Sequence, residues 1–353
     1  MGADAGEGPI IHGGLAAARQ RADRLHVVLV GHRERIQKVL DQADELPENI
    51  SIEHAEREVP MDVSATEGVR MRDSSIHVGL RLVREGKADA FVSPGNTGAV
   101  MGSSLLTLRR IEGVSRPAIA SAFPTSTGRP TFLLDCGANA DCKPAHISQF
   151  AVMGSVYSQA MYNQESPRVG LVSIGEERSK GNDLIFNARK LLYDSRINFV
   201  GNIEGRDILS GVVDVAVTDG FTGNILLKFA ESIQPMMVKS IQRQIQTNIF
   251  SRIGVMLLLP FLKRMRSKLD YAEAGGAPLL GVDGVVIICH GSSNARAISN
   301  GVGVACDMAS RDIVSRIRQE LLTNHFGQTN GANNKSSHNR NGIVCSASAD
   351  DEC

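Results

Sequence analysis

The sequence predicts an α/β fold in three layers, in which a doubly wound, mostly parallel sheet lies between two layers of helices. Three observations support this fold class. Short β-branched runs alternate with longer amphipathic stretches, which is the order of βαβ units. Most of the short runs are apolar on both faces, as expected for strands that helices cover on both sides. With 353 residues, of which 42% are hydrophobic, the chain can bury a sizeable core.

The short apolar runs are expected to form strands at Leu25–Val30, Ala88–Val92, Ala118–Phe123, Thr131–Leu134, Arg168–Ile174, Val213–Val217 and Val285–Cys289. The amphipathic stretches are expected to form helices at Ser75–Glu85, Thr97–Arg109, Pro144–Tyr157, Asn182–Leu192, Gly223–Thr247 and Ala295–Leu322. We expect one domain over residues 1–326, with a helical hairpin protruding at about 225–270. Residues 327–353 are polar and have little to bury, so we expect them to be a disordered tail.

Charge and cysteine pattern exclude several classes of protein. The formal net charge is 0, which argues against a general binder of nucleic acid. The cysteines form no CxxC pair and no cluster at zinc spacing, so we expect neither a metal site nor a disulfide framework. The longest apolar run, Ile253–Leu262, has ten residues, whereas about 20 are needed to span a bilayer. Since no signal-peptide pattern opens the sequence, we expect a cytoplasmic protein that is at most peripherally attached to a membrane.

Glycine-rich clusters follow five of the predicted strands. They are Ser93–Ala99, Asp135–Asp141, Gly175–Gly181, Asp219–Asn224 and His290–Ser293. In open parallel sheets, ligands bind beyond the carboxyl ends of the strands, where helix N-termini offer unpaired N–H groups to an anion. We therefore expect the clusters to lie at one end of the strands and to form a shared anion-binding cleft. Because the chain contains neither a GxxxxGK[ST] loop nor a GxGxxG segment after a strand, we expect no nucleotide cofactor.

Each cluster also has an ordinary structural explanation. A Gly-Asn or Asp-Gly pair is more often a turn than a site, and Thr97 or Asn224 alone fits a helix cap. His290 alone fits a structural histidine, and Lys180 alone fits a solvated loop lysine. The occurrence of five such clusters at strand ends favours a site.

Five motifs occur in a fixed order: SPGNTGA from Ser93, LDCGAN from Leu134, IGEERSKG from Ile174, DGFTGN from Asp219 and GGAPLLG from Gly275. Together they resemble the bacterial phosphate acyltransferase family of phospholipid synthesis, PlsX, over about residues 1–322. The resemblance implies an enzyme without a cofactor that converts acyl carrier protein thioesters and inorganic phosphate into acyl phosphates. It also implies a fold related to phosphotransacetylases and isocitrate-type dehydrogenases, a homodimer, and delivery of acyl phosphate to a membrane glycerol-3-phosphate acyltransferase.

The beginning of the sequence departs from this family pattern. The family usually opens with an apolar strand that leads into a D-x-M-G-G-D-x-x-P segment. Here only the stretch from Met1 to Pro9 matches that segment, with Ala3 in place of a glycine. We therefore expect that the sequence starts one strand late, or that the sheet lacks a strand. Pro94 also differs from the small residue that the family usually has at that position.

Attack of phosphate on a thioester requires a fixed phosphate, an aligned carbonyl and donors aimed at the developing oxyanion. The candidates for phosphate binding are Asn96, Thr97, Gly98, Gly223 and Asn224. We expect Lys180 to neutralise the charge of phosphate or of the transition state, and Asn139 or His290 to face the carbonyl. Asp135 and Asp141 are expected to orient Lys180 or His290 rather than to act as bases.

A long segment of the chain is basic. No acidic residue lies between Glu231 and Asp270, and the segment surrounds the apolar run Ile253–Leu262. One interpretation is a helical hairpin packed in a dimer interface, and another is that the cations bind the acidic acyl carrier protein. A third is a tip inserted in the membrane interface, which the resemblance favours. This membrane tip would consist of Met256, Leu257, Leu258, Leu259, Phe261, Lys263 and Arg264.

Other functions remain open at this point. An isocitrate-type dehydrogenase would need a divalent metal site and a nucleotide loop, and the sequence shows neither clearly. A non-catalytic, membrane-associated scaffold would retain the fold while Ala3 and the missing strand disable the site. Within the enzyme interpretation, Cys136 and Cys142 are expected to be packing residues and not nucleophiles of an acyl-enzyme.

Overall fold

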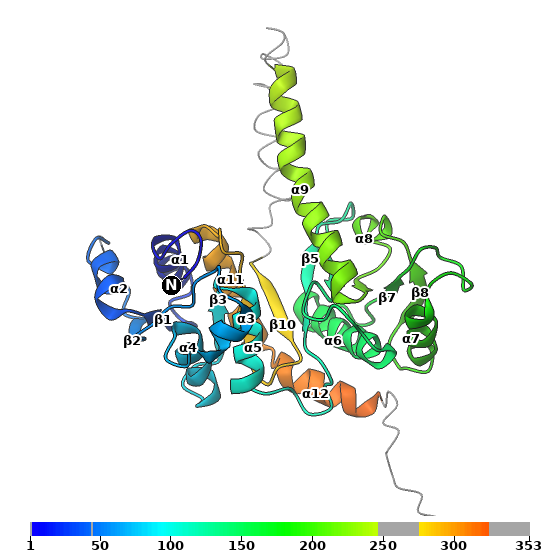
Figure 1. Cartoon of the computed structure of the whole chain (residues 1–353), viewed down its shortest axis with the longest axis horizontal. Coiled ribbons are helices and arrows are strands. Elements are labelled where there is room, and N and C mark those ends of the chain that lie inside the picture. The colour runs from blue at the N-terminus through cyan, green and yellow to red at the C-terminus, as the bar shows by residue number, and fades with distance from the viewer. Residues whose placement is uncertain (1, 44, 246–274, 325–353) are drawn as a thin grey trace, which may run out of the picture.

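The computed structural model describes residues 2–43, 45–245 and 275–324 (Figure 1). Two lobes lie on either side of strand β10 (Ala277–Leu280), and helix α9 (Gly220–Ile245) begins in the lobe that contains α6 (Pro144–Tyr162) and α8 (Asp207–Ser210) and rises above the body. The expected membrane tip at residues 256–264, the end of the expected hairpin and the expected tail at residues 327–353 lie outside the described residues.

Two sheets meet edge to edge and form the centre of the molecule. Their strand orders are β3-β11-β10-β4 and β5-β6-β9-β7-β8, and a separate parallel pair consists of β1 and β2. Only Ala120 separates β4 from β5, and its N–H donates to the carbonyl oxygen of Pro278 in β10 at 3.0 Å. The segment from β4 to β5 therefore pairs with β10 of one lobe and with β6 of the other. The remaining strands are β1 (Val27–Gly31), β2 (Ile50–His54), β3 (Ala90–Ser93), β4 (Ala118–Ile119), β5 (Ser121–Phe123), β6 (Thr131–Leu134), β7 (Val169–Val172), β8 (Phe199–Ile203), β9 (Val215–Val217) and β11 (Val285–Ile288).

The two halves of the central sheet run in opposite directions. β10 is antiparallel to β11 and to β4, and β5 is antiparallel to β6, whereas the other pairs are parallel. The carboxyl ends of β3 and β11 therefore point one way, and those of β6, β7, β8 and β9 point the other way. The predicted fold class is confirmed. Each of the five glycine clusters follows the carboxyl end of a strand, as predicted, but the antiparallel pairing in the middle divides them into two groups, one in each lobe. That the clusters share one anion-binding cleft stays a prediction.

Helices cover both faces of the central sheet, as the apolar strands predicted. Adjacent residues in one strand belong to different cores: Leu134 and Ile287 pack in one hydrophobic cluster, and Leu133 and Val286 pack in the other. The first layer contains α6 (Pro144–Tyr162), α7 (Asp183–Tyr193), α11 (Ala295–Ser310) and α12 (Ile313–Thr323). The second contains α4 (Ser75–Arg84), α5 (Thr97–Thr107), α8 (Asp207–Ser210) and the base of α9, with α3 (Ala65–Arg70) packed on α5. A smaller core joins α1 (Gly8–Gln20) and α2 (Arg33–Leu40) to β1 and β2.

The helix expected at Ala295–Leu322 is two helices. Asp312 has a φ of 50°, a left-handed conformation that ends α11 and turns the chain into α12. An aspartate adopts this conformation more readily than most residues because its short side chain can bond locally. Amphipathic periodicity continues across the break, so it gave no sign of the turn.

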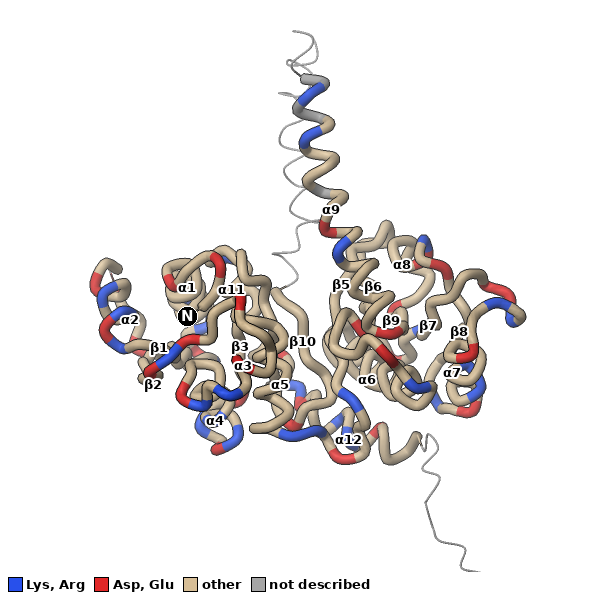
Figure 2. Tube along the Cα trace, in the orientation of Figure 1, with Lys and Arg blue, Asp and Glu red and all other residues tan. Residues whose placement is uncertain are grey.

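Helix α9 presents an apolar face to solvent beyond its base. Ile225, Phe229 and Met236 are 52%, 66% and 60% exposed, and the first two are one helical turn apart. The outer part of the helix carries Lys239 and Arg243 without an acidic residue (Figure 2). No helix of the described residues is long and apolar enough to cross a membrane.

Candidate active site

The first group of predicted site residues lies at the carboxyl ends of β3 and β11. Ser93 and Ile288 are paired across these strands, and the N–H of Cys289 donates to the Ser93 carbonyl oxygen at 2.9 Å. The loop that leads to α5 and the loop that contains His290 are therefore neighbours.

Asn96 is fully engaged in shaping the start of α5. Its Oδ1 accepts from the Ala99 N–H at 3.0 Å, which caps the helix. Its Nδ2 donates to the carbonyl oxygens of Met61 and Val63 at 3.1 and 3.0 Å. Both amide hydrogens are thus used inside the protein, so Asn96 positions the loop and offers no side-chain donor to phosphate.

The N–H groups of Thr97 and Gly98 point out of the first turn of α5, and no described group accepts from them. The first turn of α5 contains no acidic residue, and Thr97 is exposed. A helix N-terminus of this kind attracts an anion through its partial positive charge. Gly98 has a further reason to be glycine, because a Cβ atom there would lie 2.7 Å from the Cβ of Ala65 in α3.

His290 is exposed and has a defined tautomer in its neutral form. The N–H of Ser292 donates to its Nδ1 at 3.2 Å, and the Ser292 hydroxyl lies 2.7 Å from the same nitrogen. Nδ1 is therefore the acceptor and Nε2 carries the hydrogen. The ring offers one N–H donor away from its own loop.

The segment near the N-terminus reaches this group, which the sequence alone left open. The N–H of Ala5 donates to the Gly291 carbonyl oxygen at 3.1 Å, and a Cβ atom at Gly291 would lie 2.4 Å from Oδ2 of Asp4. The same Cβ would lie 2.8 Å from Cε of Met61, whose carbonyl oxygen bonds Asn96. Asp4 and Met61 are thus members of the group that sequence reasoning missed. The only signal for Asp4 was its place in the weakly matched opening motif.

The second group lies at the carboxyl ends of β6 and β9, in the other lobe, and Asp135 organises it. This carboxylate is completely buried and accepts from the N–H groups of Ile119, Gly137, Ala138 and Asn139 at 2.7 to 3.2 Å. Burial raises the pKa of Asp135, and these hydrogen bonds act against the rise. Asp135 therefore holds the loop in place and does not touch Lys180 or His290 within the described contacts.

Asn139 is engaged in the same way. Its Nδ2 donates to Asp135 Oδ2 at 2.9 Å and to the Pro117 carbonyl oxygen at 2.7 Å. Both amide hydrogens are used, so the side chain has no donor left for a thioester carbonyl. Its own carbonyl oxygen accepts from the N–H of Gly220 at 2.8 Å, which ties the loop to the first residue of α9.

The start of α9 packs directly on this loop. A Cβ atom at Gly223 would lie 1.9 Å from the Asp135 carbonyl oxygen, so only glycine fits there. Asp219 accepts from the N–H and the hydroxyl of Thr222 at 2.8 and 2.9 Å and thereby caps the helix. Asn224 is exposed and lies beside Gly137: a Cβ atom added to Gly137 would lie 3.5 Å from the Cβ of Asn224. Because the cap is already an anion, this N-terminus suits phosphate less than that of α5.

Lys180 lies on a third loop, Gly175–Gly181, which one buried asparagine holds. Nδ2 of Asn202 donates to the carbonyl oxygens of Gly175, Glu177 and Lys180 at 3.4, 3.1 and 3.2 Å. Lys180 is exposed, and no described residue bonds its Nζ. Asn202 was missed by sequence reasoning, although a polar residue in an otherwise apolar run, Phe199–Ile203, was a usable signal.

Replacing Asn202 with alanine is expected to loosen this loop. Three hydrogen bonds disappear, and local opening becomes easier by about 1–3 kcal/mol. Trypsin should then cut after Arg178 or Lys180 at least about tenfold faster than in the unchanged protein. Asn198→Ala is the matched control, because Asn198 gives a single side-chain bond, to the Ser166 carbonyl oxygen. Equal cleavage rates in the two variants would contradict this role of Asn202.

The thiols near the site are poor nucleophiles. Burial raises the pKa of Cys136 well above its usual range, and it raises the pKa of Cys142 to about 11. The Cys136 Sγ donates to the Leu133 carbonyl oxygen at 3.2 Å. Both residues therefore stay protonated at neutral pH, as expected for packing residues.

The structure thus divides the predicted site residues into two sets. Asn96, Gly98, Asp135, Asn139 and Gly223 have clear structural tasks, whereas Thr97, Lys180, Asn224 and His290 are exposed with side chains that can meet a ligand. Thr97 and His290 belong to the first group, and Asn224 belongs to the second. In the described part of the chain, no three His, Cys, Asp or Glu residues are placed to hold a metal ion.

Comparison with known proteins gives consistent matches over nearly the whole chain. A family model described as "Fatty acid synthesis protein" matches residues 1–316. The phosphate acyltransferase of Thermodesulfovibrio yellowstonii is 45% identical over 297 residues, which cover 84% of this chain and 86% of that protein. The phosphate acyltransferase of Desulforamulus reducens is 47% identical over 322 residues, which cover 91% of this chain and 95% of that protein.

Solved structures with a similar fold include two phosphotransacetylases. The enzyme from Streptococcus pyogenes has a TM-score of 0.55 at 18% identity and covers 90% of this chain and 92% of its own. The EutD phosphotransacetylase from Staphylococcus aureus has a TM-score of 0.54 at 17% identity, with coverage of 84% and 90%. At these identities the similarity shows the fold alone.

Proposed function

The chain belongs to the bacterial phosphate acyltransferase family, PlsX, and from this premise we propose that it transfers an acyl group from acyl carrier protein to inorganic phosphate. It is an acyltransferase of fatty acid and phospholipid synthesis. The observation that carries the finer proposal is the open N-terminus of α5, which suits phosphate and follows a strand paired with the one that precedes His290. The family also argues against the dehydrogenase alternative.

Phosphate is itself the nucleophile in this proposal. One of its oxygens forms a bond to the thioester carbon, the carbonyl becomes a tetrahedral oxyanion, and the C–S bond then breaks. The products are acyl phosphate and the carrier thiolate, which takes a proton from water. The protein supplies position and charge, so no covalent enzyme intermediate is needed.

The proposed roles follow from which groups remain open. The N–H groups of Thr97 and Gly98, with the Thr97 hydroxyl, bind phosphate at the N-terminus of α5. The Nε2–H of His290 donates to phosphate or to the developing oxyanion. Lys180 and Asn224 belong to the other lobe, whose strand ends point the opposite way. Their proposed roles, neutralising negative charge and orienting the thioester, therefore require the bound thioester to reach from one lobe to the other. Asp135 and Asn139 hold the loop on which α9 begins.

The test is direct trapping of the product. Purified protein is incubated with acyl carrier protein thioester and phosphate, and hydroxylamine converts any acyl phosphate to a hydroxamate. A phosphate-dependent hydroxamate signal supports the proposal. Silence from a folded protein would favour the alternative of a non-catalytic scaffold with the same fold.

The apolar face of α9 supports a homodimer. Ile225, Phe229 and Met236 are more than half exposed in the single chain, and such a face is usually covered in the assembled protein. We expect two copies to bury it against each other. Sedimentation of the Phe229→Asp variant as a monomer, with the unchanged protein as a dimer, would support this assignment.

We further propose that the basic segment attaches the enzyme to the membrane, where a glycerol-3-phosphate acyltransferase consumes the acyl phosphate. The support is the composition of residues 231–270 and the cations Lys239 and Arg243 on the outer part of α9. Leu258→Glu is expected to lower co-sedimentation with anionic liposomes at least about fivefold, because a charge in the apolar tip opposes insertion. Val212→Glu, at an exposed apolar position of the body, is the control. Unchanged liposome binding by the Leu258→Glu variant would exclude this tip as the anchor.

A further inference from the structure

A strip of exposed basic residues borders the second group of site residues. We define the basic strip as Arg109, Arg110, Arg116 and Lys143, all of which are exposed. None of the four forms an ion pair with a described carboxylate. Some other surface cations are neutralised locally; Arg57, for example, pairs with Asp73 at 3.1 Å.

Contacts within the fold make the strip continuous. Arg109 and Arg110 follow α5, and the guanidinium of Arg110 donates to the Ser115 carbonyl oxygen. The N–H of Ser115 donates to Oε1 of Gln149 in α6 at 2.8 Å. The turn that carries Arg116 therefore lies against the first half of the helix that Lys143 precedes.

His146, in the first turn of α6, lies beside Lys143, whose N–H donates to its Nδ1 at 3.2 Å. Burial lowers the pKa of His146, and the charges of Arg116 and Lys143 lower it further. Both cations are thus near the same imidazole, and their positive fields add there.

The strip is close to the loop that Asp135 organises. Arg116 directly precedes Pro117, whose carbonyl oxygen accepts from Nδ2 of Asn139 at 2.7 Å. Lys143 ends the same loop, four residues after Asn139. One turn before the strip, Leu106 of α5 is 62% exposed, which adds an apolar contact beside the cations.

We propose that the basic strip is the docking surface for the acyl carrier protein, an inference that rests on the proposed function. An acidic partner finds here several unpaired cations and an exposed leucine next to the loop that supports the start of α9. Opposite charges steer such a partner to the surface and fix its orientation. The other candidate cations, Lys239 and Arg243, lie on the outer part of α9.

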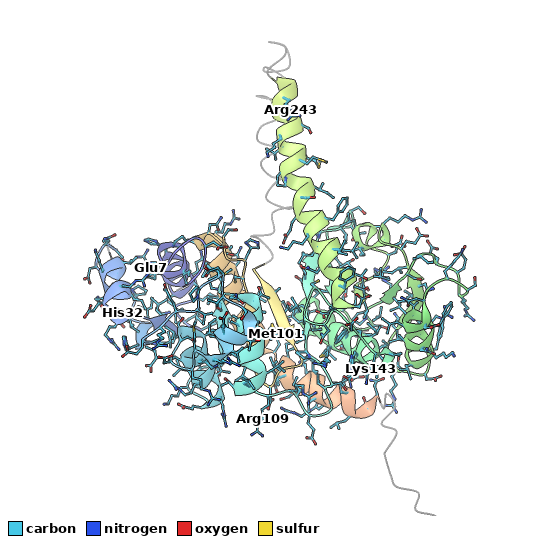
Figure 3. All side chains as sticks on the ribbon, in the orientation of Figure 1. Glu7, His32, Met101, Arg109, Lys143 and Arg243 are labelled. Carbon is cyan, nitrogen blue, oxygen red and sulfur yellow. The ribbon has the colours of Figure 1, made fainter. Side chains whose placement is uncertain are left out.

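The position of the strip fits a molecule that binds the carrier protein at the strip and the membrane at the outer end of α9. Arg109 and Lys143 lie on the lower side of the molecule, whereas Arg243 lies at the far upper end of α9 (Figure 3). A carrier protein bound at the strip would leave the outer end of α9 accessible. The protein can then hold a membrane and a carrier protein at the same time.

The experiment reverses charge at the strip and at a matched surface. The variant Arg116→Glu/Lys143→Glu is compared with Lys38→Glu/Lys190→Glu, which makes the same change of charge at exposed positions of α2 and α7. Binding of fluorescently labelled acyl carrier protein is measured by anisotropy at low salt. Steady-state rates are measured with acyl carrier protein thioester and with the small neutral thioester acyl-N-acetylcysteamine.

The strip variant is expected to bind carrier protein at least about tenfold more weakly and to show a raised KM for its thioester, with kcat unchanged. Its rate with acyl-N-acetylcysteamine should equal that of the unchanged protein, and added salt should weaken its carrier binding less steeply. Unchanged carrier binding, or an equal loss with both thioesters, would overturn the proposal. Weaker binding to anionic vesicles with unchanged carrier binding would assign the strip to a membrane and overturn it as well. If the unchanged protein binds carrier protein normally but makes no acyl phosphate, the proposed function is refuted and the docking proposal is not.

Discussion

Replacing Gly223 with alanine is expected to abolish acyl phosphate formation and to destabilise the fold. The new Cβ would lie 1.9 Å from the Asp135 carbonyl oxygen and 2.9 Å from its carbonyl carbon. Both are backbone atoms in a loop that the buried Asp135 carboxylate fixes, so neither can move aside cheaply. Overpacking usually costs about 1–3 kcal/mol, and this contact lies at the upper end of that range or beyond it.

Urea unfolding and hydroxamate formation measure the two effects of Gly223→Ala. The matched control is Gly8→Ala at the first residue of α1, where a Cβ atom would meet no atom within 4 Å. Alanine at that position is expected to leave both stability and turnover nearly unchanged. If Gly223→Ala behaves like this control, the start of α9 does not need its close approach to the Asp135 loop.

Lys180→Ala and Asn224→Ala are each expected to lower acyl phosphate formation at least about tenfold, which corresponds to about 1.4 kcal/mol of lost transition-state stabilisation. Neither side chain bonds to a described residue, and both are exposed. Their removal should therefore leave the free energy of unfolding unchanged. A loss of rate would then report chemistry and not folding.

The control for this pair is Lys190→Ala in α7, which removes an exposed lysine from a helix outside the candidate site. Lys180→Arg should retain part of the activity if the lysine acts mainly through its charge. If both alanine variants form acyl phosphate as fast as the unchanged protein, Lys180 and Asn224 have no part in the mechanism.

Local sequence patterns predicted much of the fold. The strand at Thr131–Leu134 has the predicted bounds, and the helices at Ser75 and Thr97 begin at the predicted residues. The bounds of these elements follow from local signals, either hydrophobic periodicity or a capping residue within a few positions, and a single sequence shows such signals. The strand β10 was missed, since Pro278 lacks an N–H and weakens a strand pattern. That omission also hid the reversal of the sheet.

The motifs predicted that polar side chains gather at the strand ends, but they did not predict what those side chains contact. Asn96 was predicted to bind phosphate and Asn139 to face the thioester carbonyl, but both side chains form hydrogen bonds within the protein. Their amide hydrogens are taken by the carbonyl oxygens of Met61 and Pro117, which lie 35 and 22 positions away in the chain. Such partners depend on how distant loops meet, so spacing within a motif cannot show them. The same holds for Gly223, whose need for glycine comes from contact with another strand end.

The strand segment from β4 to β5 has a mechanical consequence. β4 pairs with β10 of the first lobe, and β5, which begins two residues after β4 ends, pairs with β6 of the second, so one continuous segment supplies an edge strand to both sheets. A fragment that stops between the lobes would expose an unpaired strand edge and aggregate. Because the two sheets share this segment, we expect the lobes to melt together, as one transition in differential scanning calorimetry; two separate transitions would contradict this expectation.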